Sequence, residues 1–437
     1  MVLEREGVAG GKARTIRLGK FCMEAGPTGF MAPDGTLDEI ARSSLSTECR
    51  LQAREASARR YLVLEDALRE VRPSPVALVR SGILSPLGLL RMASETVRRR
   101  KLDEADESIH AFARRRLGSQ VADRMIAPMV QGVYAGDAKR LSLAAAFPKL
   151  AALERDHGSL IRGMLAKRKE KSAGGPAGPG GTLTSFKDGL QSLPLALAEK
   201  GGFEVRTNAD ARELHRLEDG RWRVVLQSGE VIDATAVVLA GECWSMAPLV
   251  RGVSPAMASE LAGIDCPPVA VVAMGYGGDA LSKVPQGFGA LIPRGEGYRM
   301  LGVLWDTHIF EGRSPDGKLL LRCMYGGSLD PEAGRMSEQE LADLAREELG
   351  RLHGLPPHTE LEHVVRWPRA IPQYELGHLE RVRRIEKELE QLPGLFLAGN
   401  ALHGVAFGKA AEAGARAGKA AAQYVQEWNE RGSSARG

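Results

Sequence analysis

The sequence predicts an α/β (α+β) protein in which a Rossmann-like nucleotide-binding domain, assembled from separated segments, accompanies a helical insertion and a second, β-rich domain. The chain opens with a short apolar strand that ends in Glu4, followed by a loop that closes on Gly10 and Gly11. It closes with a buried strand, a glycine turn and an Ala-rich helix from residue 395 onward. Between these ends, segments with strand alternation and segments with helical spacing follow one another, as in mixed α/β folds.

The N-terminal segment carries one half of a dinucleotide-binding signature. In such proteins the carboxylate binds the ribose hydroxyls, and a strand, a G-x-G-x-x-G turn and a helix lie about twenty residues before it. Here three residues precede Glu4, and G-x-G-x-x-G has no match elsewhere in the chain. We therefore expect the first Rossmann strand and its turn to be missing from a truncated start.

Composition excludes several classes of protein. A chain of 437 residues with 43% hydrophobic and 26% charged residues is long enough for two or three soluble domains. The net charge of +4 gives little support to nucleic-acid binding. The five cysteines lie far apart, which argues against a metal site or a disulfide framework and fits a reducing cytoplasm. Neither a spanning helix nor a secretion signal is indicated.

The region after residue 70 changes character. Pro73 and Pro75 mark the boundary, and 71–170 has mainly helical spacing, with helix start signals at 103–108. The Gly- and Pro-rich stretch 172–181 indicates a flexible loop. Helical spacing follows over 186–199, with further helices at 337–353, at 379–391 and from the glycine loop after 400 to about Trp428. Strands are predicted over 221–226, 236–240, 269–274, 299–304, 319–324 and 395–400.

Several strings of residues, in a fixed order, carry a resemblance to a known family. The specific ones are the G-V-Y-A-G-D string at 132–137 and the I-P-Q-Y-E-L-G-H string at 371–378. Weaker ones are 4–11, 24–27, 106–108, 185–190, 287–289 and 399–406. With these strings the chain resembles the FAD-dependent protoporphyrinogen oxidases of the flavin amine-oxidase superfamily over nearly its whole length.

The resemblance implies a domain organisation and a cofactor site. The FAD-binding domain would comprise residues 1–70, 182–260 and 366–437. The helical domain would comprise 71–170, the flexible loop 171–181, and the β-rich substrate domain 261–365. Glu4 would bind the adenosine ribose, and Gly10 and Gly11 would let the backbone approach the diphosphate. The other implied FAD contacts are Gly26, Pro27, Ala211, Trp367, Gly399, Asn400, Gly404, Val405 and Ala406.

The resemblance also implies a substrate site. Arg60 would pair with a porphyrinogen propionate, because a guanidinium binds a carboxylate through two parallel hydrogen bonds. Arg59 is the alternative partner, and Arg60 could instead be a solvated surface residue. Met274, Leu291 and Phe310 would line an apolar slot, with Gly132 or Gly136 placing backbone against it. Phe310 could equally be a core residue, and His378 is expected to be structural.

The implied chemistry needs no catalytic acid or base from the protein, because the cofactor carries the difficult step. The expected reaction is oxidation of protoporphyrinogen to protoporphyrin, with hydride transfer to FAD and oxygen reduced to hydrogen peroxide. Coproporphyrinogen or an amine as substrate, or a porphyrin-binding remnant without flavin, remain alternatives. The sequence departs from the family at Val8, usually an arginine, at Thr28-Gly29, and at Arg212, where Ala211 could take the adenine contact in a shifted register.

The apolar stretch 76–91, with the basic run 98–101 nearby, could lie on a membrane surface. Packing of the same stretch on the second domain is an equal alternative. The implied partners are the porphyrinogen, oxygen, a ferrochelatase and a second copy in a homodimer. The expected location is cytoplasmic, with a peripheral position on the inner membrane face left open.

Overall fold

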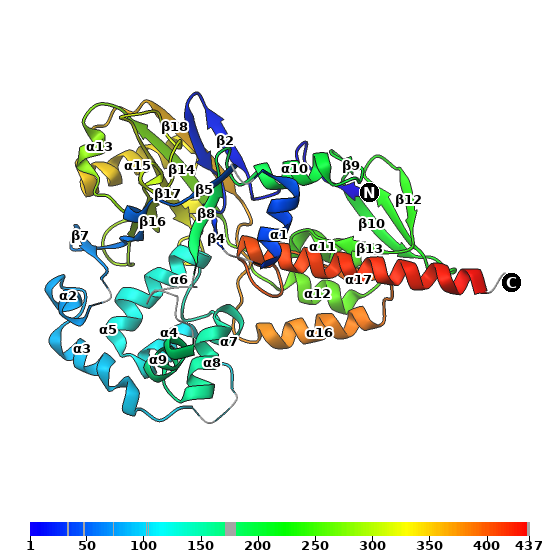
Figure 1. Cartoon of the computed structure of the whole chain (residues 1–437), viewed down its shortest axis with the longest axis horizontal. Coiled ribbons are helices and arrows are strands. Elements are labelled where there is room, and N and C mark those ends of the chain that lie inside the picture. Colours follow the sequence, from blue (N-terminus) through cyan, green and yellow to red (C-terminus); the bar gives the residue numbers. More distant parts are fainter. Residues whose placement is uncertain are drawn as a thin grey trace.

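The computed structural model describes residues 1–32, 35–46, 49–72, 74–101, 103, 105–170 and 181–434. Pro73, Glu104 and most of the loop expected over 171–181 lie outside these residues. The molecule is elongated, with a lobe around β14 and α15 at one end and a lobe around α11, α12 and α17 at the other (Figure 1). A group of helices lies beside the first lobe. The predicted fold class is confirmed.

The lobe that contains both chain ends is built from parallel strand pairs and helices. β1 (Val2–Leu3) pairs with β9 (Val205–Arg206), and β13 (Val237–Leu239) pairs with β19 (Leu395–Leu397), both in parallel. In the described residues these two pairs form separate sheets. One apolar core, which includes Leu3, Trp222 and Leu395, joins them. The antiparallel meander β10 (Ala211–Arg216), β11 (Trp222–Leu226) and β12 (Val231–Ala234) packs on this core with α11 (Cys243–Val250), α12 (Pro255–Ala262) and α16 (His378–Glu390).

The other lobe is a seven-stranded sheet. Its order is β18 (Leu361–Trp367), β14 (Val269–Tyr276), β17 (Leu319–Gly326), β16 (Gly302–Leu304), β15 (Gly289–Leu291), β6 (Tyr61–Leu64) and β7 (Ala67–Glu70). Residues 61–70, expected in the nucleotide-binding domain, therefore form an edge of the β-rich sheet. The parallel pairing of β6 with β15 holds them there, and no short-range pattern reveals such a distant partner.

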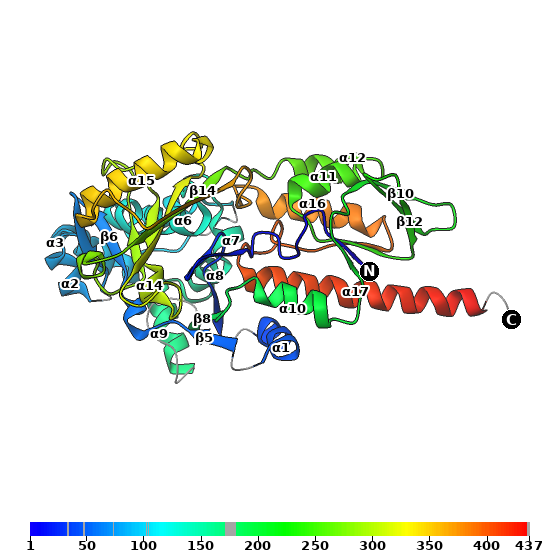
Figure 2. The same ribbon diagram turned by 90° about the horizontal axis from the view of Figure 1, so that it is seen from above.

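Helix α15 (Glu338–His353) covers one face of this sheet (Figure 2). A capping box between Ser337 and Glu340 satisfies backbone N–H groups at its start. On β14, Met274 packs with Leu341 of α15, whereas Ala273 packs with Trp367 on the opposite face. Alternation along the strands thus separates a structural face under α15 from a second face that is turned toward the rest of the molecule.

The helical region corresponds to the predicted one. It contains α2 (Pro75–Arg80), α3 (Pro86–Ala93), α4 (Ile109–Arg116), α5 (Ser119–Val121), α6 (Ala127–Tyr134), α7 (Leu143–Ala146), α8 (Pro148–His157) and α9 (Leu160–Glu170), with short 3-10 (Ser94–Val97) and π (Ala122–Ile126) turns. A buried ion pair between Arg116 and Glu95 holds it together, and Glu95 also accepts a hydrogen bond from the Ser159 hydroxyl at 2.6 Å. No helix in the described part of the chain has the length and apolarity that crossing a bilayer requires.

Smaller elements connect the lobes. They are the hairpin β2 (Thr15–Leu18)–β3 (Phe21–Glu24), the sheet β4 (Phe30–Ala32)–β8 (Thr182–Phe186)–β5 (Arg50–Gln52), and the helices α1 (Gly35–Ser44), α10 (Ser192–Lys200), α13 (Ala280–Lys283) and α14 (Asp306–Ile309). The helix predicted over 186–199 begins only at Ser192, because Phe186 ends β8 and packs in a core with Phe30. The C-terminal helix α17 (Phe407–Ser434) runs alongside α10 (Figure 2).

Candidate cofactor and substrate site

Glycine loops from distant parts of the chain meet between the lobes. Gly26 follows β3 and lies directly against the backbone of Lys12, so that a Cβ at position 26 would overlap the Lys12 carbonyl oxygen. Gly10 has φ +124°, and a Cβ there would lie 3.1 Å from Pro194 of α10. Only glycine permits the close approach of the two backbone loops at Gly26. The two predicted glycine motifs, 10–11 and 26–27, are therefore parts of one site.

Trp367, at the end of β18, adjoins the same loops. Its indole Nε1–H donates a hydrogen bond of 2.7 Å to the carbonyl oxygen of Ala25. This bond fixes the indole beside Gly26 and Pro27, at the point where the seven-stranded sheet meets the lobe that contains both chain ends. The implied position of Trp367 beside a planar ring is therefore compatible with its surroundings.

The C-terminal glycine loop is held in place by Tyr374. The Tyr374 hydroxyl donates to the carbonyl oxygen of Asn400 at 2.5 Å and accepts from the N–H of Gly404 at 2.7 Å. Gly399, with φ +100°, approaches the carbonyl oxygen of Gly241. The next residue, Glu242, forms an ion pair of 2.6 Å with Lys12, which connects this loop to the N-terminal one.

Glu4 and Ala211 lie together at the far end of the site. The carbonyl oxygen of Glu4 accepts a hydrogen bond of 2.9 Å from the N–H of Ala209, two residues before β10 begins at Ala211. The Glu4 carboxylate accepts only from the nearby N–H of Glu6 among the described residues. The half-buried Glu4 side chain thus keeps acceptor capacity, as a carboxylate that binds ribose hydroxyls requires.

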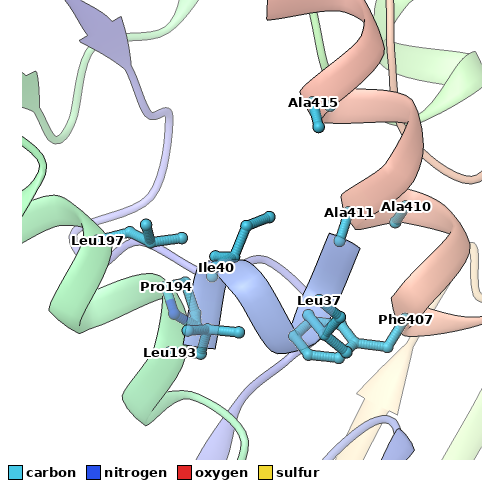
Figure 3. A pocket seen from close by; sticks show the side chains of 11 residues that line it. Leu37, Ile40, Leu193, Pro194, Leu197, Phe407, Ala410, Ala411 and Ala415 are labelled. Carbon is cyan, nitrogen blue, oxygen red and sulfur yellow. The ribbon is translucent and has the colours of Figure 1, made fainter. Parts of the chain in front are cut away.

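An apolar cavity of about 320 Å³ lies beside Gly10 and the start of α17. Its side chains come from three helices, α1, α10 and α17, and point toward one another across the gap (Figure 3). The lining residues are Gly10, Leu37, Ile40, Leu193, Pro194, Leu197, Phe407, Ala410, Ala411, Gly414 and Ala415. The cavity borders the loop of Gly10. Because it offers almost no polar partners, it is not suited to a diphosphate.

The second face of the seven-stranded sheet carries a row of apolar residues. Leu62, Leu291, Gly302, Met324 and Val271 are direct neighbours across five successive strands, so their side chains share this face. A Cβ at position 132 would overlap the Leu291 side chain, so Gly132 of α6 packs directly against the row. The structure thus brings the predicted residues Gly132 and Leu291 together. Met324, which sequence reasoning missed, lies in the same row.

Other predicted substrate residues lie elsewhere. Met274 is fully buried under α15, on the opposite face from Leu291, because strand alternation turns its side chain away. Phe310 is 2% exposed, and its ring tip would lie 3.4 Å from a Cβ on Gly29. Gly136 lies against the side chains of Gln373 and Leu141, one turn beyond the contact made by Gly132.

Arg60 stands directly before β6, at the edge of the apolar row. Its guanidinium lies over the Phe288 ring, 5.0 Å from the centroid. Although the residue as a whole remains exposed, partial burial of the guanidinium lowers the pKa of Arg60. None of the described carboxylates lies within ion-pair distance of it. A desolvated cation without a partner is a fitting site for a ligand carboxylate.

A buried ionic cluster under the site was not predicted. Arg322 of β17 pairs with Asp306 at 2.5 Å and donates to the carbonyl oxygen of Glu24 at 2.6 Å. Arg313 reaches the Glu24 carboxylate at 3.4 Å. Burial raises the pKa of Glu24, and the charge of Arg313 offsets part of this effect. The signal in the sequence was an arginine inside the otherwise apolar strand 319–324, which could have indicated a buried ion pair.

His378 is structural in character, as expected. Its ring stacks on Tyr374 with centroids 4.0 Å apart, and its Nε2 hydrogen-bonds the carbonyl oxygen of Leu402 at 3.1 Å. Burial lowers its pKa to about 4. The histidine therefore supports Tyr374 and, through it, the C-terminal glycine loop.

Glycine loops at the junction of two lobes, with an apolar sheet face nearby, fit an enzyme in which the protein binds and orients a cofactor. The chain belongs to the family of flavin-containing amine oxidoreductases, which it matches over residues 1–426. Protoporphyrinogen oxidase 1 from chloroplasts of Arabidopsis thaliana is 31% identical over 434 residues, 94% of this chain and 80% of that protein. Coproporphyrinogen III oxidase from Propionibacterium freudenreichii subsp. freudenreichii is 31% identical over 450 residues, 92% and 82% of the two chains.

Solved structures show the same fold. A protein from Exiguobacterium sp. 255-15 superposes with a TM-score of 0.82 at 22% identity, covering 98% of this chain and 92% of that one. Reduced UDP-galactopyranose mutase gives a TM-score of 0.69 at 15% identity, covering 94% and 86%. The predicted family is confirmed, and the protein is an FAD-dependent oxidoreductase.

The residues present fit FAD. Nothing lies within 4 Å of the Cβ position of Gly11, so this loop presents open backbone to a diphosphate, and Glu4 offers carboxylate oxygens at the adenosine end. Trp367, Gly26 and Pro27 would border the flavin ring, with Gly399, Asn400, Gly404, Val405 and Ala406 on the side of α17. When bound, FAD supplies the electron acceptor for hydride removal from a substrate.

Proposed function

We propose that the protein oxidises protoporphyrinogen IX to protoporphyrin IX in haem biosynthesis, with oxygen as terminal acceptor and hydrogen peroxide as by-product. Relatives that match most of the chain are named protoporphyrinogen oxidases and coproporphyrinogen III oxidases, which supports a porphyrinogen as the substrate class. The substrate is a flat, apolar macrocycle with propionate side chains. Recognition therefore requires an apolar surface with a cation at its edge.

The observation that carries this proposal is the unpaired Arg60 beside the apolar row of Leu62, Leu291 and Met324. The row would contact the macrocycle, and Gly132 would let the backbone of α6 approach it. Arg60 would bind a propionate and orient the ring relative to the flavin. The protein residues thus bind, orient and exclude water, and no side chain is required to transfer a proton.

The test is turnover of purified, FAD-loaded protein with protoporphyrinogen IX, followed by porphyrin fluorescence and oxygen consumption. Replacing Arg60 by alanine removes a charge-assisted hydrogen bond of about 1.5–3 kcal/mol, so KM should rise roughly ten- to hundred-fold. Arg59→Ala is the matched control, because Arg59 is adjacent in sequence. A larger effect of Arg59→Ala would transfer the role to that residue.

The alternatives give different results in the same assay. Faster turnover of coproporphyrinogen III would make that the substrate, and turnover of amines alone would reject the porphyrinogen proposal. The hypothesis of a porphyrin-binding remnant without flavin requires that the purified protein be colourless. A flavin absorption band in protein expressed from Met1 and purified without added FAD would rule that hypothesis out.

We further propose that α2, α3 and the turn after them contact a membrane containing anionic lipids. Apolar side chains point outward here: Val76 is 58%, Leu87 78%, Leu90 67% and Val97 81% exposed. The basic residues Arg98, Arg99, Arg100 and Lys101 follow directly. On the other side of this segment, Leu78 of α2 and the turn residues Ile83 and Leu84 pack on β6, so packing on the sheet accounts for only part of the apolar stretch 76–91.

Flotation with vesicles of phosphatidylglycerol and phosphatidylcholine tests this surface. The double variant Leu87→Asp, Leu90→Asp should lose most vesicle binding, because two charges would enter the lipid interface. Val231→Asp is the control, since Val231 is 51% exposed in the other lobe. Equal binding by both variants would reject the surface. A peripheral position on the cytoplasmic side would also suit transfer of the poorly soluble porphyrin to a ferrochelatase. The expected homodimer is tested separately, by light scattering of the purified protein.

A further inference from the structure

Two buried cysteines touch at the junction of the lobes. Cys243 is the first residue of α11, and Cys266 lies between α12 and β14. Their sulfur atoms are 3.5 Å apart, and both residues are buried, with exposed fractions of 1% and 8%. All five cysteines are free thiols in the structure. The family assignment and the proposed reaction give this pair no role.

We propose that Cys243 and Cys266 form a peroxide-reactive dithiol, an oxidative modification site that takes a hydroperoxide and closes into an intrachain disulfide. The thiols are already in contact, so bond formation requires an approach of about 1.5 Å to the usual S–S length of about 2 Å. The remaining cysteines offer no such pair: Cys22 contacts Arg313, Cys49 contacts Ser46, and Cys323 lies in the sheet core.

Local electrostatics assign separate roles to the two thiols. The hydrogen bond between the two sulfur atoms and the backbone N–H of Trp244 lower the pKa of Cys243, whereas the same bond and burial raise the pKa of Cys266. The Cys243 thiolate is therefore the group that attacks, as the thiolate rather than the thiol is nucleophilic. The N-terminal position of Cys243 on α11 favours its negative charge further.

The chemistry balances in two steps. The Cys243 thiolate attacks one peroxide oxygen, the O–O bond breaks, hydroxide leaves, and a sulfenic acid forms. The Cys266 sulfur then attacks the sulfenic sulfur, and the S–O bond breaks with loss of water. Overall, two thiols and one hydrogen peroxide give one disulfide and two waters. The proposed porphyrinogen reaction would be one source of peroxide, but the dithiol does not depend on it.

The position of the pair gives the bond a mechanical consequence. Cys266 belongs to the hinge segment (264–268), which leads from the nucleotide-binding lobe into the seven-stranded sheet. Carbonyl oxygens of this segment accept bonds from the N–H groups of Ala370 at 3.0 Å and Gln373 at 2.8 Å, in the return crossing. A disulfide would tie both crossings to α11, next to the loop of Gly241 and Gly399.

The test treats the intact, FAD-loaded protein with a small excess of hydrogen peroxide. Titration of thiols after denaturation should fall from five to three, and a thiol reductant should restore five. Peptide mapping should recover Cys243 and Cys266 in one cross-linked peptide. Cys243→Ser should retain its four thiols under the same treatment, and Cys266→Ala should trap Cys243 as a sulfenic acid that a dimedone probe labels.

Cys49→Ser is the matched control, because Cys49 is the most accessible of the five cysteines. This variant should still lose two thiols. The proposal is overturned if Cys49 or Cys22 is oxidised before Cys243, or if the cross-linked peptide is absent after two thiols are lost. It is equally overturned if Cys243→Ser loses thiols as fast as the unaltered protein.

Discussion

At the scale of single residues, glycines decide where the cofactor loops can meet. The backbone of Lys12 approaches Gly26 so closely that no side chain fits between them. This contact joins the loop after β1 to the loop after β3, and the Lys12–Glu242 ion pair extends it to the third loop. The sequence predicted Gly26 as a cofactor residue, and the structure adds the reason why this position must be glycine.

Replacing Gly26 by alanine should therefore separate the two loops. We expect overpacking to cost about 1–3 kcal/mol of unfolding free energy, together with loss of most bound FAD on gel filtration. Gly414→Ala is the matched control, because nothing lies within 4 Å of its Cβ position in α17. That variant should gain up to about 1 kcal/mol through helix propensity and keep its flavin. Equal flavin retention in both variants would contradict the assigned role of Gly26.

The substrate residues illustrate what a pattern in one strand leaves undetermined. Leu291 and Met274 both lie in apolar strands, and both were predicted to line the slot. The face that each side chain occupies depends on the register with the neighbouring strand, β17 for Met274 and β16 for Leu291, and on which face α15 covers. A single strand that is apolar on both faces contains no such information. Its own sequence therefore could not separate Met274, under α15, from Leu291, on the candidate substrate face.

At the scale of elements, alternation and capping signals predicted most strands and helices, but not their partners. The strands at 269–274 and 319–324 were located correctly, and β14 and β17 extend each by two residues. The helix predicted over 337–353 is α15, which begins one residue later at Glu338. Residues 61–70 were assigned to the nucleotide-binding domain rather than to the β-rich one, because their partner β15 lies more than two hundred residues away along the chain.

The ion pair between Arg322 and Asp306 connects β17 to α14 and to the end of β3 through the Glu24 carbonyl. Both charges are buried, so removing one leaves the other without compensation. Arg322→Met should lower the unfolding free energy by about 3–5 kcal/mol, whereas Arg322→Met with Asp306→Leu should recover much of that loss. Denaturant titration measures both values. A double variant no more stable than the single one would contradict this account of the pair.

At the scale of the whole molecule, the functional surfaces lie where separated segments meet. The cofactor loops come from residues near 10, 26, 367 and 400, and the apolar row crosses five strands of the sheet. The resemblance to a family predicted which separated segments form these surfaces. A family pattern reflects long-range contacts, whereas local periodicity does not. The buried cluster of Arg322, Asp306 and Arg313 was missed. Its charges form buried pairs inside the junction, but the residues do not form a recognisable sequence motif.

Burial of neutral histidines in both lobes should make the whole fold sensitive to acid. Burial lowers the pKa of His353, at the end of α15, to about 4, against about 6.5 for a free histidine. Below about pH 6.5 the unfolded chain therefore binds a proton that the native state rejects, and stability falls until about pH 4. At about 1.36 kcal/mol per pKa unit, this histidine accounts for roughly 3 kcal/mol of that loss.

His353→Phe should flatten the dependence of unfolding free energy on pH between about 6.5 and 4, because phenylalanine keeps a ring against Trp305 but cannot titrate. The variant should leave the contribution of His378 in the other lobe unchanged, since burial lowers the pKa of that residue independently. His358→Gln is the control, because His358 is exposed. Urea titrations at several pH values measure the slope, and an unchanged slope in His353→Phe would show that His353 has the same pKa in the native and unfolded states.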